Sequence, residues 1–277
     1  MTMLASWVGI DTHGIGSAYI VSESRFTWKQ SRKTYAWDYG KKVFASCLYP
    51  EIFGYAGDVL FPTVILSQII GLIDSEVIFN KNTSCEQKSQ LVFELLRSEL
   101  TKYPLNCIND SFQIIHISRD TIVNGYPNFH IYCYFWDKKN GWQKFEKPIP
   151  RESGLVYVLG SGREEFNNNY ILKYQRGNNS DTSRNVFHCF VDTLSSINDS
   201  CCGGAPQLVG VYRKPNSSAK NFGVIYNDKR YFLGCEVPED VCFENIEWRN
   251  ELFELVSGRT KSIIKGAMRQ PNALMNK

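Results

Sequence analysis

The order of strand-like and helix-like segments constrains the fold of this chain more than any other feature of its sequence. Short β-type runs come first and two helical segments follow. Three further β-type runs, a third helix and closing strands complete the chain. A parallel sheet would require regular alternation of strand and helix, which this order lacks. We therefore expect an α+β fold with two antiparallel sheets and helices on their outer faces.

The first hairpin begins almost at the N-terminus. Apolar and small residues at 4–10 are followed by the turn sequence THGIG and by a second apolar run at 17–24. This pattern is typical of a β-hairpin. Two short strands are predicted in GKKVFAS and EIFGYAG, and later strands are expected at 112–118, 129–136 and 154–160.

Three helices are predicted from capping residues and apolar spacing. Pro62 suits a first helical turn and opens an apolar run that continues through residue 73. A second helix is expected at about 83–103, because Thr83 or Ser84 can cap it and a proline follows it. A third has one apolar stripe within 181–199.

The domain organisation is simple, because nothing in the sequence repeats and no long linker interrupts it. We expect one domain at residues 1–239. Residues 240–277 are expected to form a helical or partly flexible C-terminal extension.

Charge and hydropathy argue against nucleic-acid and membrane partners. The 31 Lys and Arg residues against 28 Asp and Glu residues leave a formal net charge of only +3. No basic and apolar leader precedes the first strand, and the most apolar region, at 59–73, is too short to span a bilayer. We expect a cytoplasmic protein.

The cysteines and histidines predict no disulfide framework and no metal site. The nine cysteines are odd in number, scattered and never in a CxxC pair, so reduced and mostly buried thiols are expected. They are Cys47, Cys85, Cys107, Cys133, Cys189, Cys201, Cys202, Cys235 and Cys242. The four histidines, His13, His116, His130 and His188, show no metal-binding spacing.

Four short segments carry a family resemblance: SESRFTW, YGKKVFA, FGYAGD, and the pair LGSG and DSCCGG. In this order they resemble the motifs of β-type proteasome subunits and of bacterial proteasome-like peptidases, which are N-terminal-threonine hydrolases. The resemblance covers about residues 2–234. It implies a four-layer αββα sandwich and hydrolysis of peptide bonds.

The resemblance assigns the central chemistry to three residues. Thr2 is the nucleophile, exposed by removal of Met1, because a first-residue threonine has its own α-amino group as base. Lys42 stands at the catalytic lysine position and Glu23 at the position of the acid. A buried lysine lowers the pKa of a neighbouring hydroxyl, and the acid keeps the lysine charged.

Further roles follow from the same resemblance. The Gly57 amide would form the oxyanion hole. Ser161 and Asp199 match the supporting network, in which Cys202 stands where serine is usual. The substrate-binding positions are Thr27, Gly40 and Tyr55. The resemblance also implies a homo-oligomeric ring or spiral that acts on peptides or unfolded proteins, with an ATP-dependent unfoldase as a candidate partner. No cofactor is expected, since LGSGREE lacks the third glycine and the lysine of nucleotide-binding motifs.

The sequence leaves three alternatives open. A shifted alignment puts Ala5 at the nucleophile position, so that only cleavage before Ser6 would expose a nucleophile. A catalytically inactive scaffold or sensor subunit is the second alternative, motivated by Met3, Cys202 and the long first strand. A small-amide hydrolase of the wider N-terminal-nucleophile group is the third, and Lys42 disfavours it.

Overall fold

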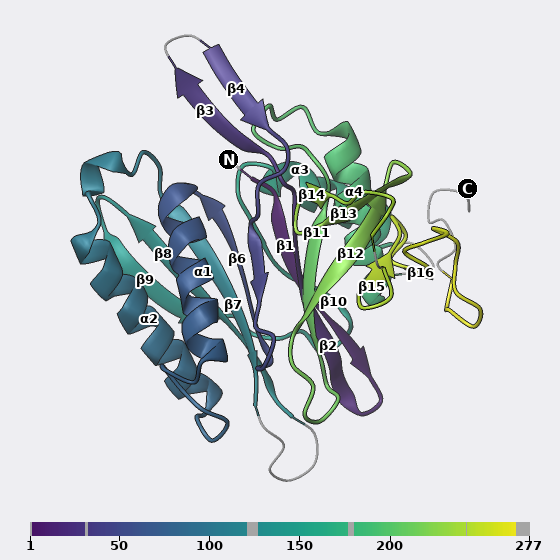
Figure 1. Ribbon diagram of the computed structural model, residues 1–277, viewed down its shortest axis with the longest axis horizontal. Helices are drawn as coiled ribbons and strands as arrows, with labels where there is room; N and C mark the ends of the chain where they lie inside the picture. The colour runs from purple at the N-terminus through teal and green to yellow at the C-terminus, as the bar shows by residue number, and fades with distance from the viewer. Residues whose placement is uncertain (1, 31–32, 121–126, 177–179, 242, 270–277) are drawn as a thin grey trace.

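The computed structural model describes residues 2–30, 33–120, 127–176, 180–241 and 243–269. Two sheets lie face to face, and each carries helices on its outer face (Figure 1). The strand orders are β10-β1-β2-β11-β12-β13-β14 in the first sheet and β5-β6-β7-β8-β9 in the second. Neighbouring strands along both orders are antiparallel. The expected α+β, four-layer αββα sandwich is confirmed.

The first sheet contains β1 (Leu4–Asp11), β2 (Gly14–Ser22), β10 (Gly154–Leu159), β11 (Gln207–Tyr212), β12 (Lys220–Tyr226), β13 (Lys229–Phe232), β14 (Cys235–Glu236), β15 (Glu247–Arg249) and β16 (Leu255–Val256). The second contains β5 (Val43–Ala45), β6 (Glu51–Gly57), β7 (Phe112–Arg119), β8 (Phe129–Asp137) and β9 (Gly141–Glu146). A separate hairpin is formed by β3 (Phe26–Gln30) and β4 (Lys33–Trp37).

The helices divide between the two outer faces. The second sheet is covered by α1 (Leu60–Asp74) and α2 (Cys85–Lys102), and the first by α3 (Arg163–Asn169) and α4 (Ser183–Ser196). A 3-10 turn, Leu105–Cys107, follows α2, and a π-helical turn, Tyr170–Tyr174, follows α3.

The core is layered because side chains alternate across each strand. Leu4 and Ile20 of the first sheet and Ile52 and Ile115 of the second belong to the cluster between the sheets, and all four are fully buried. Trp7, on the opposite face of β1, belongs instead to the cluster under α4. Strand β1 is therefore covered on both faces, and this fixes its position in the middle of the molecule.

Local signals predicted several elements correctly. The hairpin of β1 and β2 starts at Leu4, as expected. Helix α2 begins at a complete capping box, in which the Ser84 side chain accepts from the Gln87 amide and the Gln87 side chain bonds back to the Ser84 amide.

The hairpin of β3 and β4 projects from the body beside the N-terminal end of the chain (Figure 1). Aromatic cross-strand pairs join its strands, Phe26 with Trp37 and Trp28 with Tyr35. Trp28, Tyr35 and Trp37 are each about half exposed, at 52%, 51% and 48%. Apolar alternation does not predict this hairpin, because both of its faces carry exposed side chains.

The C-terminal segment differs from expectation. Residues 240–277 were expected to form a helical or partly flexible extension; among the described residues 240–241 and 243–269 there is no α-helix. Instead β15 pairs in parallel with β12 and antiparallel with β16. Trp248, Phe253 and Val256 are at most 4% exposed and join the core. Burial of these side chains against the sheet outweighs local helix propensity; residues 270–277 lie outside the described residues.

All eight cysteines within the described residues are free thiols, as expected. Only half of them are buried, namely Cys85, Cys133, Cys189 and Cys202, so the expectation of mostly buried thiols was too strong. Cys242 lies outside the described residues.

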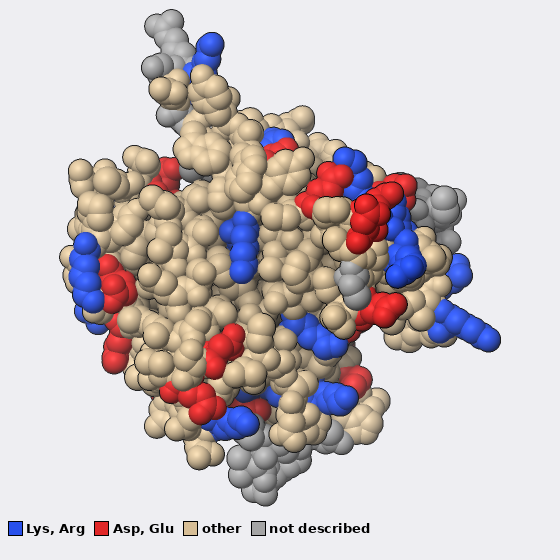
Figure 2. Space-filling view, in the orientation of Figure 1, with Lys and Arg blue, Asp and Glu red and all other residues tan. Residues whose placement is uncertain are grey.

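The surface carries charges of both signs. On the face seen in Figure 2, Lys and Arg side chains are interspersed with Asp and Glu, and much of the face is uncharged. In the described part of the chain, no helix combines the length and the apolar character that crossing a membrane requires.

Candidate active site

Thr2 lies two residues before the inner strand β1 and is 1% exposed. Its Oγ1 accepts a hydrogen bond from Lys42 Nζ at 3.0 Å. Its carbonyl oxygen accepts from the Gly162 amide at 3.2 Å. Both the side chain and the backbone of this threonine are therefore held in place.

Glu23 and Lys42 form a buried ion pair beside Thr2. Glu23 follows β2 and Lys42 precedes β5, so the two sheets each supply one partner. Lys42 Nζ makes a short contact with Glu23 Oε1, and the side chains are 1% and 0% exposed. Burial raises the pKa of Glu23, and the lysine charge lowers it by a smaller amount. The Arg25 amide also donates to Glu23 Oε2, at 2.5 Å.

Ser161, Asp199 and Cys202 form a second group. The Ser161 hydroxyl makes a short hydrogen bond to Asp199 Oδ2, and the Cys202 thiol donates to the same oxygen at 3.4 Å. Burial acts to raise the pKa of Asp199, but hydrogen bonds from Ser161 and from the Cys201 amide bring it below its usual value. Burial, together with the charges of Glu23 and Asp199, raises the pKa of Cys202 to about 12. The Cys202 side chain is therefore a neutral thiol at neutral pH.

Arg25 and the turn after Asp199 connect the two groups. Arg25 Nη1 donates to the Cys202 carbonyl at 3.2 Å, and its Nε and Nη2 bind the Asp38 carboxylate at 2.7 and 2.9 Å. The Gly203 amide lies 3.4 Å from Glu23 Oε2. The predicted catalytic residues thus share one continuous hydrogen-bonded region.

Gln207, the first residue of β11, is a positioning residue that sequence reasoning missed. Its Nε2 donates to the carbonyl oxygens of Glu23 at 3.0 Å and Gly40 at 2.8 Å, and its Oε1 accepts from the Lys42 amide at 2.9 Å. The side chain is 1% exposed. The one available signal was an amide residue opening the apolar run QLVGVY.

Gly57 ends β6 with φ at 109°. A Cβ there would lie 2.1 Å from the Ser111 carbonyl oxygen, so both the conformation and the space require glycine. Gly57 lines a cavity of about 350 Å³ together with Gly160 and Arg163. Because Gly160 precedes Ser161, this cavity lies next to the Ser161 group.

The three predicted substrate-binding residues lie in different surroundings. Thr27 lines a cavity of about 530 Å³ with Trp28 and Asp58. The Gly40 carbonyl oxygen accepts a hydrogen bond from Gln207. A Cβ on Gly40 would lie 2.4 Å from the Phe26 ring. Tyr55 is fully buried, and its hydroxyl lies 2.5 Å from Thr63 Oγ1 on α1. The structure therefore places Thr27 at a cavity and Tyr55 in the core beneath the helices.

Ser6 occupies a different environment from Thr2. It lies within β1, is fully buried, and donates to the Tyr157 carbonyl oxygen on β10 at 3.3 Å. Exposing Ser6 as a first residue would remove Leu4 and Ala5, which are fully buried and pair with both neighbouring strands. The geometry favours Thr2 over the shifted alignment.

Comparisons with known proteins identify no family. No family model matches the chain, and no curated protein matches it. Among solved structures it is similar to a mutant of Anbu from Hyphomicrobium sp. strain MC1, with 13% identity over 80% of this chain and 87% of the other, and a TM-score of 0.49.

Proposed function

We propose that this chain is a threonine-type peptidase subunit in which Thr2, once it is the first residue, attacks peptide bonds. The observation that carries the proposal is the 3.0 Å contact between Lys42 Nζ and Thr2 Oγ1 inside a buried Glu23–Lys42 pair. An ion pair that only stabilised the fold would not require a threonine hydroxyl within hydrogen-bonding distance of the lysine.

The residues divide the chemistry between them. The free Thr2 amine accepts the Oγ1 proton, and the positive charge of Lys42 stabilises the developing alkoxide. Attack on a substrate carbonyl gives a tetrahedral intermediate, whose oxyanion accepts a hydrogen bond from the Gly57 amide. Collapse forms an ester and releases the amine product, to which the Thr2 ammonium returns a proton. Water then hydrolyses the ester. Ser161 and Asp199, with Cys202, hold the Thr2 amine in position.

The backbone at Thr2 supports exposure of its amine. Its φ is 99°, a value unfavourable for a β-branched residue. Such conformations cost on the order of 1–3 kcal/mol. The torsion φ is defined only while another residue precedes Thr2, so release of the amine also removes this strain.

The assembly and its substrates form a further part of the proposal. We propose a cytoplasmic homo-oligomer, in a ring or spiral, that degrades peptides or unfolded proteins delivered by an ATP-dependent unfoldase. The support is the motif resemblance and the hydrogen-bonded region that the predicted catalytic residues share. No cofactor takes part in the reaction.

The test compares Thr2→Ala and Thr2→Ser with wild type. Intact-mass measurement first establishes that the preparation begins at Thr2. Thr2→Ala should lose hydrolysis of fluorogenic peptides by several orders of magnitude and should not react with a β-lactone, whereas Thr2→Ser should retain part of both. Thr12→Ala, an exposed threonine in the first turn, is the matched control and should behave as wild type. Activity that survives Thr2→Ala contradicts the proposal.

One observation favours the second candidate, an inactive scaffold or sensor subunit. Thr2 is 1% exposed and Met3 is fully buried, packed where a Cβ on Gly162 would lie 2.9 Å from Met3 Cβ. A permanently closed site would serve only structure. Correctly processed, oligomeric wild-type protein that neither hydrolyses peptides nor reacts with the β-lactone would establish the scaffold function instead.

A further inference from the structure

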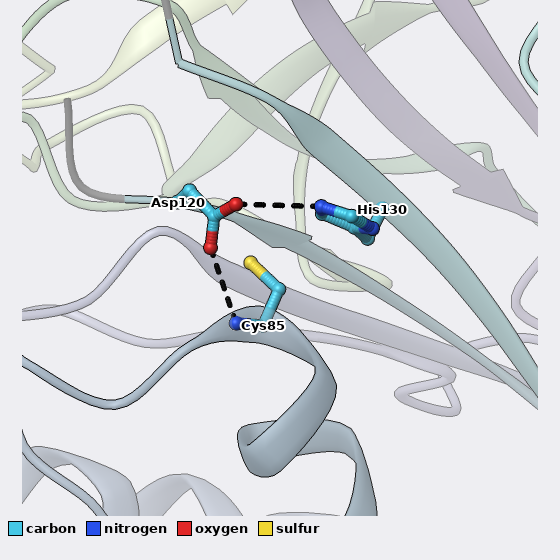
Figure 3. A group of neighbouring side chains, drawn as sticks. All are labelled: Cys85, Asp120 and His130. Carbon is cyan, nitrogen blue, oxygen red and sulfur yellow. Dashed lines mark hydrogen bonds and ion pairs between the residues drawn. The ribbon is translucent and has the colours of Figure 1, made fainter. Parts of the chain in front are cut away.

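Three side chains with metal-ligating atoms meet at the end of the second sheet opposite Gly57. Cys85 Sγ, an oxygen of Asp120 and a ring nitrogen of His130 all lie within 4.8 Å of one another. Figure 3 shows the Cys85 sulfur directed into the space between the other two side chains. Strand β6 pairs Gly57 with Phe112 and Glu51 with Ser118, so this cluster lies about 20 Å from the Gly57 end of the sheet.

Three separate elements hold these side chains. Cys85 is the first residue of α2, Asp120 directly follows β7, and His130 is the second residue of β8. The Cys85 amide donates to Asp120 Oδ1 at 3.1 Å, and the Asp120 amide donates to the Asn128 carbonyl oxygen at 2.9 Å. The positions of the three side chains are therefore set by helix, strand and turn together.

The His130 ring is oriented by Glu146. His130 Nδ1 lies 2.8 Å from Glu146 Oε1, which leaves Nε2 facing Asp120 Oδ2 at 3.4 Å. A histidine that binds a metal ion commonly donates its other ring N–H to a carboxylate in this way. With Nδ1 donating to Glu146, Nε2 is the ring nitrogen that faces Asp120 and that a metal ion at the cluster would bind.

We propose that Cys85, Asp120 and His130 bind a zinc-type divalent transition-metal ion. Thiolate, imidazole and carboxylate form a mixed set that suits Zn²⁺, whereas Mg²⁺ and Ca²⁺ bind oxygen ligands. With Zn–N and Zn–O bonds of about 2.0–2.2 Å, a tetrahedral site separates its nitrogen and oxygen by about 3.4 Å. The observed Nε2 to Oδ2 distance is also 3.4 Å.

Access and charge suit such an ion. The Cys85 side chain is buried, but Asp120 and His130 are 31% and 28% exposed, so the ion can enter from their side. A thiolate and a carboxylate together neutralise a divalent cation, and three protein ligands leave a fourth position for water. The ion would tie the start of α2 to the ends of β7 and β8.

The same contacts also make sense without an ion. Asp120 accepts a hydrogen bond from the Cys85 amide at the start of α2 and pairs with His130, and the Cys85 thiol lies 2.9 Å from Ser118 Oγ. In that case the three side chains are a structural network only. Metal binding and its ligand dependence separate the two interpretations, and they do so independently of any activity of Thr2.

The experiment titrates the chelator-treated full chain, kept reduced, with Co²⁺ and then with Zn²⁺. We expect one tightly bound Co²⁺ with a thiolate-to-cobalt charge-transfer band and strong tetrahedral absorption, displaced by one equivalent of Zn²⁺. Cys85→Ser should abolish the charge-transfer band, and His130→Gln should weaken binding strongly. Glu146→Gln should keep the band but weaken binding by about 10–100-fold. Cys107→Ser and His13→Gln, which alter exposed residues elsewhere, are the matched controls.

Thermal unfolding provides a second readout. Zn²⁺ should raise the Tm of wild type and of the two controls but not that of Cys85→Ser. The proposal is overturned if wild type binds no Co²⁺, if the bound Co²⁺ lacks the thiolate band, or if Cys85→Ser binds Zn²⁺ as tightly as wild type. Circular dichroism verifies that each variant is folded. If Cys85→Ser does not fold, the Co²⁺ affinity of Glu146→Gln provides the test, because this variant leaves all three ligands in place.

Discussion

Replacing Lys42 by methionine while keeping Glu23 should destabilise the protein strongly. The two side chains are 1% and 0% exposed, so Lys42→Met leaves a buried carboxylate without its cation. Removing one partner of a buried pair costs about 3–5 kcal/mol. Each kcal/mol lowers Tm by about 2–4 °C in a protein of roughly this size, so we expect a decrease of about 6–20 °C. A loss of activity in this single variant would therefore not distinguish chemistry from folding.

The double variant Lys42→Met with Glu23→Gln makes that distinction. Replacing both members of a buried ion pair by neutral groups is often neutral or stabilising. Glutamine also retains an oxygen for the Arg25 amide, which lies 2.5 Å from Glu23 Oε2. We expect Tm to return close to the wild-type value. Peptide hydrolysis should remain absent, because no positive charge then faces Thr2 Oγ1.

The destabilisation in Lys42→Met should depend on pH in a defined direction. Burial raises the pKa of Glu23, and Lys42 opposes this rise. Without the lysine, the folded-state pKa rises further above the unfolded value of about 4.3. The folded state then holds a proton that the unfolded state releases, so stability falls as pH rises between the two pKa values. The Tm deficit should be smaller at about pH 5 than at about pH 8, and the double variant should show no such difference.

The measurements are thermal unfolding by circular dichroism at both pH values and hydrolysis of a fluorogenic peptide. If Lys42→Met unfolded at the same temperature as wild type, the contact between Glu23 and Lys42 would not be a buried charged pair. A double variant that still hydrolyses peptides would show that Lys42 has no part in catalysis.

Two further changes test the surroundings of the site, and two more test the C-terminal segment. Gln207→Leu leaves the Gly40 carbonyl and the Lys42 amide without their side-chain partner, so we expect a loss of about 1–3 kcal/mol in unfolding free energy and a lower kcat, measured by denaturant unfolding and peptide kinetics. Gly57→Ala should lower both Tm and kcat because no Cβ fits there, and wild-type values would contradict the assigned backbone geometry. Trp248→Ala should cost about 3–5 kcal/mol, and truncation after residue 239 should prevent cooperative unfolding if the C-terminal segment belongs to the core.

The parts of the fold that sequence predicted are those fixed by local signals. The capping box at Ser84 marks the start of α2 through contacts three residues apart, and the apolar runs of β1 and β2 are joined by one turn. The C-terminal segment has no such signal. Strand β15 forms by pairing with residues 222–224 of β12. This pairing buries Trp248 over Gly223, where a Cβ on the glycine would lie 2.2 Å from the indole. That pairing depends on where β12 lies in the sheet, which the local sequence of the C-terminal segment does not show.

The same distinction between local and long-range signals applies to the residues of the candidate site. Thr2, Glu23 and Lys42 could be named because short motifs keep their order, and the structure places them in contact. Gln207 could not be named, because its amide acts on Glu23 across 184 residues of sequence and gains that role only where β11 lies beside β2.

The cluster of Cys85, Asp120 and His130 escaped sequence reasoning for a related reason. Metal motifs are recognised when ligands recur at short, regular intervals on one element. Here a helix start, a strand end and a strand start each supply one ligand, and the intervals are set by the lengths of α2, β7 and the segments between them. The absence of a spacing motif therefore excludes only sites built on a single element. A site built where antiparallel strands and a helix end meet can be recognised only once the sheet order is known.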